Sequence, residues 1–178
     1  ISPGVTGYDI NCGVRLLATT TEARAVRKRI STLVDLLFTH IPSGVGGRGP
    51  IHLSEGDMAA VLEQGAAWAV KRGYGAKEDL ARIEEGGSAR DAQAEAITDK
   101  ARQRGRDELG TLGSGNHFVE VQRVERIRNP DEAERMGVFE DQLCFMIHSG
   151  SRGLGHQTCT DYVNICRRAM PQYGIQIP

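Results

Sequence analysis

Glycine is unevenly distributed along this chain, and its clusters decide where regular structure can form. The chain has 178 residues and 22 glycines, and many of these fall in residues 4–13, 44–49, 110–115 and 150–155. Glycine adopts positive φ angles and lets the backbone approach other groups closely, so clusters of this kind indicate loops. The regular elements are therefore expected between these four segments.

Apolar residues recur between the glycine clusters with the spacing of strands or helices. Residues 14–18, 116–122 and 142–148 are predicted strands. The spacing predicts helices over residues 21–38, 54–71 (with Ser54 as N-cap), 89–104 (exposed) and 156–170, a short acidic segment at 76–85 and a turn at 129–131. This order predicts a mixed α/β (α+β) fold, with polar residues concentrated where strands meet glycine loops.

Composition excludes several classes of protein. The chain carries 22 Lys and Arg against 23 Asp and Glu, so it is not a uniformly basic nucleic-acid binder, and RNA contacts would need local patches. No apolar run is long enough for a membrane span, and no secretory signal is visible. Four cysteines without a CxxC pair indicate reduced thiols and a cytoplasmic location.

Residue types that bind metals occur in three places beside glycines. Asp9 and Cys12 are three residues apart in one turn, and a thiolate can bridge two ions. His117 and His148 lie at predicted strand ends. Each has a structural alternative: an Asx turn, a small buried thiol, or a hydrogen-bonded strand histidine. Together they indicate a metal site, and the softness of the donors alone favours zinc.

The glycine loop at residues 149–155 has two interpretations. Its backbone N–H groups and the forked guanidinium of Arg152 suit a phosphate. Alternatively, the glycines serve tight turns, since no GxxxxGKS or Rossmann-type glycine motif is present. His156 follows this loop at the predicted helix start, where a capping role or a phosphate contact is expected.

Three motifs resemble the RtcB-type RNA ligases: YDINCGVRL at residues 8–16, GTLGSGNHFVE at 110–120 and IHSGSRGLGH at 147–156. Residues 69–75 and 78–80 fit the same family. The motifs keep their order and approximate separations, and the similarity covers nearly the whole chain. The resemblance implies an RtcB-like fold, present in part, with metal ligands at strand ends and glycine-rich loops.

Members of that family join RNA 3′-phosphate or 2′,3′-cyclic phosphate ends to 5′-hydroxyl ends in tRNA splicing and RNA repair. They use GTP and two manganese ions and pass through a guanylated histidine. By resemblance, Asp9, Cys12 and His117 would hold one Mn²⁺, and Cys12 would bridge to a second Mn²⁺ shared with His148 and a later histidine that has no match in residues 1–178. The resemblance thus replaces zinc by manganese as the expected metal.

The same resemblance assigns the remaining site residues. Asn116 would contact guanylate phosphates, Phe118 and Glu120 would lie near the guanine, and Arg152 would hold an RNA or nucleotide phosphate. The implied partners are RNA with broken ends, such as tRNA halves, then GTP and an activating protein. No membrane partner is implied.

No residue of 1–178 matches the guanylated histidine, which is expected beyond Pro178. The chain is therefore expected to be a partial catalytic domain, lacking an N-terminal stretch and a C-terminal part, and inactive by itself. Two alternatives stay open. One is a metal-dependent RNA-end phosphoesterase with a water nucleophile, and the other is a catalytically incomplete metal- or RNA-binding fragment.

Overall fold

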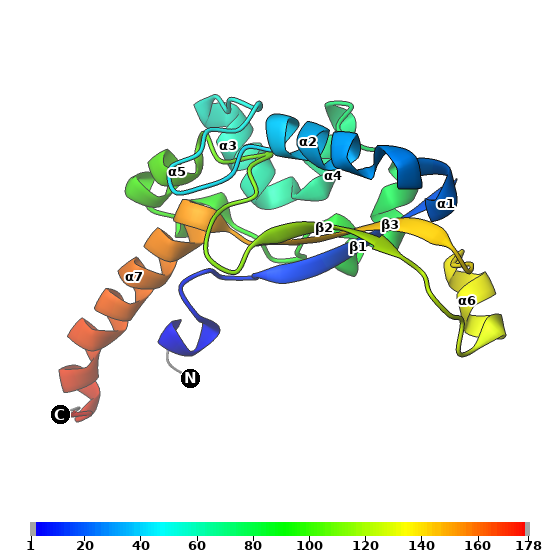
Figure 1. Cartoon of the computed structure of the whole chain (residues 1–178). Helices are drawn as coiled ribbons and strands as arrows, with labels where there is room; N and C mark the ends of the chain where they lie inside the picture. The colour runs from blue at the N-terminus through cyan, green and yellow to red at the C-terminus, as the bar shows by residue number, and fades with distance from the viewer. Residues whose placement is uncertain (1–2, 177–178) are drawn as a thin grey trace.

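A three-stranded antiparallel sheet forms the centre of the computed structural model, which describes residues 3–176 (Figure 1). Its strands are β1 (Gly13–Glu22), β2 (Phe118–Arg123) and β3 (Gln142–Ser149), in the order β1-β3-β2. All three predicted strands are confirmed, and with the helices around them they make a mixed α/β structure. β1 extends beyond the predicted residue 18 because three threonines follow, and β-branched residues favour strands.

The register of the sheet decides which side chains share a face. His148 of β3 pairs with Val14 of β1 on one side and Phe118 of β2 on the other. Because successive side chains alternate between faces, every second residue along each strand joins this row. We call this the open face; it consists of Val14, Leu16, Ala18, Phe118, Glu120, Gln122, Cys144, Met146 and His148.

Helix α2 (Ile30–His40) lies along the opposite face of the sheet (Figure 1). The chain begins with the 3₁₀ turn η1 (Pro3–Thr6), which precedes β1. Between β1 and α2 lie the short helix α1 (Ala23–Val26) and the 3₁₀ turn η2 (Arg27–Arg29). The single helix predicted over residues 21–38 is therefore wrong in part. Residues 21 and 22, predicted as the start of that helix, continue β1. Where β1 ends, the backbone carbonyl of Asp141 accepts a hydrogen bond from Ala23 N at 2.6 Å and holds the chain there.

The helix predicted over residues 54–71 is two helices, α3 (Glu55–Gln64) and α4 (Ala66–Lys71). Ser54 is the N-cap, as predicted: Asp57 N donates to Ser54 Oγ at 3.1 Å. The break is at Gly65, with φ +53°, where a side chain would overlap the carbonyl oxygen of Gly87. Leu53, Met58 and Trp68 form the buried apolar cluster of this part of the chain.

The predicted exposed helix at residues 89–104 is wrong over its first half. A helix, α5 (Asp99–Gly105), begins only after Thr98, whose hydroxyl accepts a hydrogen bond from Ala101 N at 3.2 Å. Ala101 and Gly105 are buried, so one side of this helix packs against the chain, while Asp99, Lys100, Gln103 and Arg104 are exposed as predicted. The acidic segment predicted at residues 76–85 forms the short 3₁₀ turns η3 (Lys77–Arg82) and η4 (Glu84–Gly87), and a further turn, η5 (Ala94–Ala96), follows before α5.

Two other helix boundaries differ from prediction. The predicted turn at 129–131 begins α6 (Pro130–Met136), because Asn129 caps it and proline suits a first helical position. The last helix, α7 (Arg152–Ala169), begins before the predicted residue 156 and is followed by η6 (Met170–Tyr173). His156 is therefore in the second turn of α7, not at its start.

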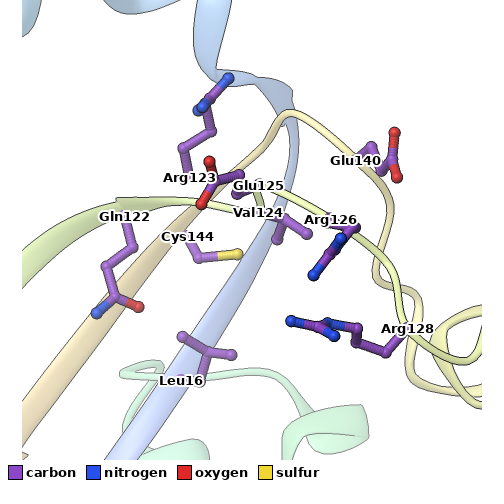
Figure 2. A pocket seen from close by; sticks show the side chains of 9 residues that line it. All are labelled: Leu16, Gln122, Arg123, Val124, Glu125, Arg126, Arg128, Glu140 and Cys144. Atoms are coloured by element: carbon purple, nitrogen blue, oxygen red, sulfur yellow. The ribbon is translucent and has the colours of Figure 1, made fainter.

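A cavity of about 870 Å³ opens at the end of the open face formed by Gln122 and Cys144 (Figure 2). Leu16 and Cys144 line it from the sheet, and Arg126 and Arg128 point into it from the segment after β2. Cys144 is buried. Among the helices of residues 3–176, none is long and apolar enough to cross a membrane.

Candidate metal centre

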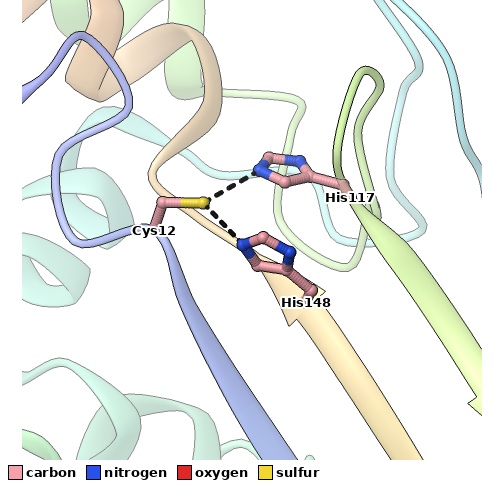
Figure 3. A group of neighbouring side chains, drawn as sticks. All are labelled: Cys12, His117 and His148. Atoms are coloured by element: carbon pink, nitrogen blue, oxygen red, sulfur yellow. Dashed lines mark hydrogen bonds between the residues drawn. The ribbon is translucent and has the colours of Figure 1, made fainter.

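The sulfur of Cys12 lies between two histidine rings (Figure 3). Cys12 Sγ is 3.3 Å from His117 Nε2 and 3.0 Å from His148 Nε2. One ligand atom from each of these residues lies within 4.8 Å of the other two. A thiol and two imidazoles at such distances form a group that can hold a metal ion.

The sheet register brings these residues together from distant parts of the sequence. Cys12 directly precedes β1, His117 directly precedes β2, and His148 is the penultimate residue of β3. In an antiparallel sheet, the start of an outer strand lies beside the end of the central strand. Gly13 pairs with Ser149, and Phe118 pairs with His148. These pairings therefore place Cys12, His117 and His148 together at the same end of the sheet, where β1 and β2 begin and β3 ends.

Asp9 adds a carboxylate on the His117 side of the sulfur. Asp9 Oδ2 lies 2.7 Å from His117 Nε2. Its other oxygen, Oδ1, accepts hydrogen bonds from the Ser151 hydroxyl at 3.2 Å and from Arg152 N at 3.0 Å. Asp9 is not part of the mutually close group of Cys12, His117 and His148. All four residues predicted as metal ligands are thus neighbours in the structure. Asp9 lies next to His117 and outside the mutually close group of three.

Two glycines allow Asp9 and Ser151 to approach each other. A Cβ at Gly150 would lie against both carboxylate oxygens of Asp9, and one at Gly155 would overlap the Ser151 hydroxyl. Side chains at these positions would push Ser151 or Asp9 away. Gly150 and Gly155 therefore serve close approach around Asp9 and Ser151, which the sequence interpretation did not foresee.

The surroundings shift the pKa values of both N-terminal residues. Partial burial acts to raise the pKa of Asp9, but the hydrogen bonds from Ser151 and Arg152 and the nearby His117 outweigh it, so the pKa lies below its usual value. Burial, followed by the negative charge of Asp9, raises the pKa of the Cys12 thiol. Asp9 is thus a ready anionic donor, whereas Cys12 needs a cation nearby to become a thiolate.

The ring of His117 is held tightly in this site. Its side chain is 4% exposed, and its Nδ1 is buried without a hydrogen-bond partner among residues 3–176. A Cβ at Gly113 would lie against this Nδ1, so the loop backbone packs directly on the ring. Only Nε2 of His117 faces Asp9 and Cys12, which makes it the atom available to a metal.

The residues predicted to bind GTP lie near the centre or extend from it along the open face. The ring of Phe118 packs edge-on against His148, with centroids 5.3 Å apart. Glu120 is the next open-face residue of β2 and accepts a hydrogen bond from Gln122 at 2.8 Å. Asn116 is exposed in the loop before β2. Their nucleotide contacts stay a prediction.

Arg152 is held by neighbouring loops. Its Nε donates to Thr111 Oγ1 at 3.4 Å and its NH2 donates to the Gly44 carbonyl at 3.3 Å. Its backbone has φ +55°, which is unusual for a residue other than glycine. Its phosphate contact stays a prediction, and the loop-holding role was missed. Ser151 was also missed, although a serine in a glycine-rich loop is a signal for a side chain that bonds nearby backbone or carboxylate groups.

A small antiparallel sheet that gathers a thiol, two imidazoles and a carboxylate at one end of its strands defines a candidate metal-binding domain. The family model described as tRNA-splicing ligase RtcB matches residues 1–178. The chain belongs to this family.

Archaeal relatives described as tRNA-splicing ligase RtcB agree with this assignment. The protein of Thermococcus kodakarensis is 49% identical over all 178 residues, and that of Archaeoglobus fulgidus is 47% identical over the same length. The protein of Aeropyrum pernix is 51% identical over 174 residues, or 98% of this chain. The chain spans only 36–37% of the length of these relatives.

Proposed function

We propose that this chain forms the metal-binding part of a GTP- and manganese-dependent RNA ligase. The ligase would join RNA 3′-phosphate or 2′,3′-cyclic phosphate ends to 5′-hydroxyl ends, with tRNA halves as one substrate class. Family membership supports the RNA ligase class. The observation that carries the proposal is the convergence of Cys12, His117 and His148 at one end of the sheet, where β1 and β2 begin and β3 ends.

The donor set fits a divalent transition metal. A carboxylate whose pKa is already lowered, a thiol and two imidazoles supply one hard, one soft and two intermediate donors. The closest donor atoms are 2.7–3.3 Å apart, so one ion can touch neighbouring donors without large side-chain movement. Zinc and manganese are both compatible with these donors, and the proposal commits to manganese on the family resemblance.

The arrangement around Cys12 supports a bridging thiolate. Asp9 and His117 lie on one side of the sulfur, and His148 approaches it separately at 3.0 Å. One ion would be held by Asp9, Cys12 and His117, and a second by Cys12 and His148. Bound divalent ions neutralise phosphate charge and align an in-line displacement.

The remaining residues would orient the reactants. Phe118 offers a ring face and Glu120 a carboxylate on the open face beside His148, which suits a guanine base, and Asn116 would reach guanylate phosphates. Arg152, already anchored to Thr111 and Gly44, would present its remaining N–H groups to a phosphate. Four free cysteines are compatible with a reducing compartment, and a cytoplasmic location is part of the proposal.

Titration calorimetry with Mn²⁺ tests the metal centre. The wild-type chain should bind Mn²⁺ tightly at the Asp9 side and more weakly at the His148 side, where fewer ligands are present. Cys12→Ala should remove both binding events, because one sulfur serves both ions. Cys166→Ala, which changes a partly buried cysteine of α7, is the matched control and should bind as wild type. Undiminished binding in Cys12→Ala would overturn the bridging role, and a large preference for Zn²⁺ over Mn²⁺ would overturn the choice of metal.

Labelled GTP separates the ligase from its alternatives. With Mn²⁺, this chain should bind metal without forming a covalent guanylate, because its motifs contain no match to the family's guanylated histidine. A longer protein that contains this chain should form the adduct and ligate RNA ends. Release of phosphate from RNA 3′-phosphate ends without GTP would instead support a phosphoesterase. An adduct on this chain that disappears in His156→Ala would show that the chain carries its own nucleophile.

A further inference from the structure

Segment 105–111, which joins α5 to the loop before β2, runs beside the first turn of α7. Three contacts connect the two: Gly105 with Leu154, Glu108 with Gly153, and Thr111 with Arg152. The middle contact is a hydrogen bond from Gly153 N to Glu108 Oε2 at 2.7 Å. A Cβ at Gly153 would lie against both carboxylate oxygens of Glu108, so the carboxylate packs directly on this backbone. Glu108 thus holds the start of α7 against the segment.

Two carboxylates from different parts of the chain meet at the start of α7. The first N–H groups of a helix have no partner within the helix, and the N-cap, Ser151, makes no side-chain capping bond here. Instead, Asp9 Oδ1 accepts from Arg152 N at 3.0 Å, and Glu108 Oε2 accepts from Gly153 N. Negative charge is favoured at this end of a helix. A candidate metal ligand and Glu108 are therefore bound to neighbouring amides of one helix.

The backbone between these two amides is strained. Arg152 has φ +55°, and a residue other than glycine keeps such a conformation only where its surroundings fix it. Rotation about the N–Cα bond of Arg152 would turn the peptide group that carries its N–H relative to α7. The bond to Asp9 fixes the peptide group before this rotation axis, and the bond to Glu108 fixes the amide after it. Without Glu108, the start of α7 can relax and carry the Arg152 N–H away from Asp9.

We infer that Glu108 is a positioning residue for the Asp9 side of the candidate metal centre. It acts through α7, because its bond to Gly153 keeps the Ser151 hydroxyl and Arg152 N at Asp9 Oδ1. Asp9 Oδ2 then faces His117 Nε2, where one ion would be held. Groups that orient a metal ligand from behind tune the affinity of the site without contacting the ion.

The effect of Glu108 should be confined to one side of the centre. Cys12 and His148 meet through the pairing of β1 with β3, which does not involve α7. The backbone of Asp9 has its own anchor, because its carbonyl accepts a hydrogen bond from Cys12 N at 3.1 Å. Loss of Glu108 should therefore loosen the orientation of the Asp9 side chain and leave the Cys12–His148 contact in place.

Hydrogen exchange of single amides, read by NMR on the metal-free chain, tests the inference without the metal. In Glu108→Ala the amides of Gly153 and Arg152 should both exchange at least about tenfold faster, because both lose a fixed acceptor. Glu108→Gln should stay close to wild type, since its side-chain carbonyl can accept the same hydrogen bond. Amides of β3 report global unfolding and should change much less. Faster exchange of the Gly153 amide alone would show that Glu108 only caps the helix, and would overturn the inference.

Calorimetric titration with Mn²⁺ extends the test to the metal centre, and this part rests on the proposed function. Glu108→Ala should weaken the tighter binding event, at the Asp9 side, by about tenfold and leave the weaker event at the His148 side unchanged. Glu108→Gln should keep both. Ser54→Ala, which removes the N-cap of α3, is the matched control and should lower stability without changing either event.

Two results separate the inference from the proposed function. Equal weakening of both binding events in Glu108→Ala would show that Glu108 supports the fold in general, and would overturn the inference. A wild-type chain that binds no Mn²⁺ would overturn the proposed function instead, and the exchange of the Arg152 amide would then decide the role of Glu108 by itself.

Discussion

The Ser151 hydroxyl donates a 3.2 Å hydrogen bond to Asp9 Oδ1, and this bond joins two segments that are 142 residues apart in sequence. The bond occupies one carboxylate oxygen and leaves Oδ2 toward His117 Nε2 at 2.7 Å. Ser151 thereby fixes which oxygen of Asp9 faces the candidate metal centre. Groups that orient metal ligands in this way contribute measurably to metal affinity.

Ser151→Ala should therefore weaken Mn²⁺ binding at the Asp9 side by about tenfold, the lower end of the effect of such orienting groups. The Arg152 amide still holds Asp9, so binding should not be lost. Calorimetric titration measures the change. Thr158→Ala is the control, because this hydroxyl bonds the Leu154 carbonyl within α7 and its loss should leave affinity unchanged. Equal affinities in both variants would show that Ser151 does not orient Asp9.

Gly155→Ala should destabilise the chain by about 1–3 kcal/mol, because the new methyl group overlaps the Ser151 hydroxyl and overpacks the site. Gly56→Ala in α3 is the matched substitution. It meets nothing within 4 Å, so alanine should stabilise the helix by about 0.5–1 kcal/mol. Urea unfolding measures both free energies. Two changes of the same sign would contradict the packing argument.

Arg152→Lys should lower the free energy of unfolding by about 1–2 kcal/mol, because a lysine cannot reproduce the fork that bonds Thr111 and Gly44. Mn²⁺ affinity should be retained, since Asp9 is bonded by the backbone N–H of residue 152. Affinity for a 3′-phosphorylated RNA oligonucleotide should fall. Loss of metal binding would show that the guanidinium supports the whole site instead of a phosphate.

Stability should fall in acid partly through Asp161, a residue of α7 whose carboxylate contacts Thr98, the N-cap of α5. Hydrogen bonds from Thr98 at 2.6 Å and from Gln157 at 2.8 Å hold the pKa of this carboxyl below its ordinary value. A group whose pKa is lower in the folded state stabilises the fold above its unfolded pKa, near 3.9. That contribution is lost as pH falls through the lower, folded value.

The Asp161→Asn variant isolates this contribution. Around pH 6 it should be less stable than wild type by about 1 kcal/mol, the usual size of a hydrogen bond to a charged group at a partly exposed site. The difference should shrink as pH falls below about 4, where the wild-type carboxyl becomes protonated. Urea unfolding between pH 3 and pH 6 measures it, with Asp131→Asn as the control. A difference that does not change with pH would rule out the carboxylate charge as its cause.

Local features of the fold could be predicted from the sequence. The strands that end in His148 and begin beside Cys12 and His117 were predicted from apolar runs that stop at glycines. Ser54 was recognised as a cap because its hydroxyl satisfies an amide three residues ahead. The helix breaks were missed, because Gly65 interrupts a periodic pattern only when another segment, at Gly87, packs against it.

The sequence by itself determined the donor types of the candidate site, Asp9, Cys12, His117 and His148, and their position beside glycine loops. The family resemblance implied that Cys12 stands between the two histidines with Asp9 on the His117 side, but only the tertiary structure provides the contacts that place them so, including the bond from Ser151 that holds Asp9. The Cys12–His148 contact spans 136 residues, and local spacing carries no information about such a distance. Strand register and the close approach allowed by glycine set it, and both depend on how the whole chain packs.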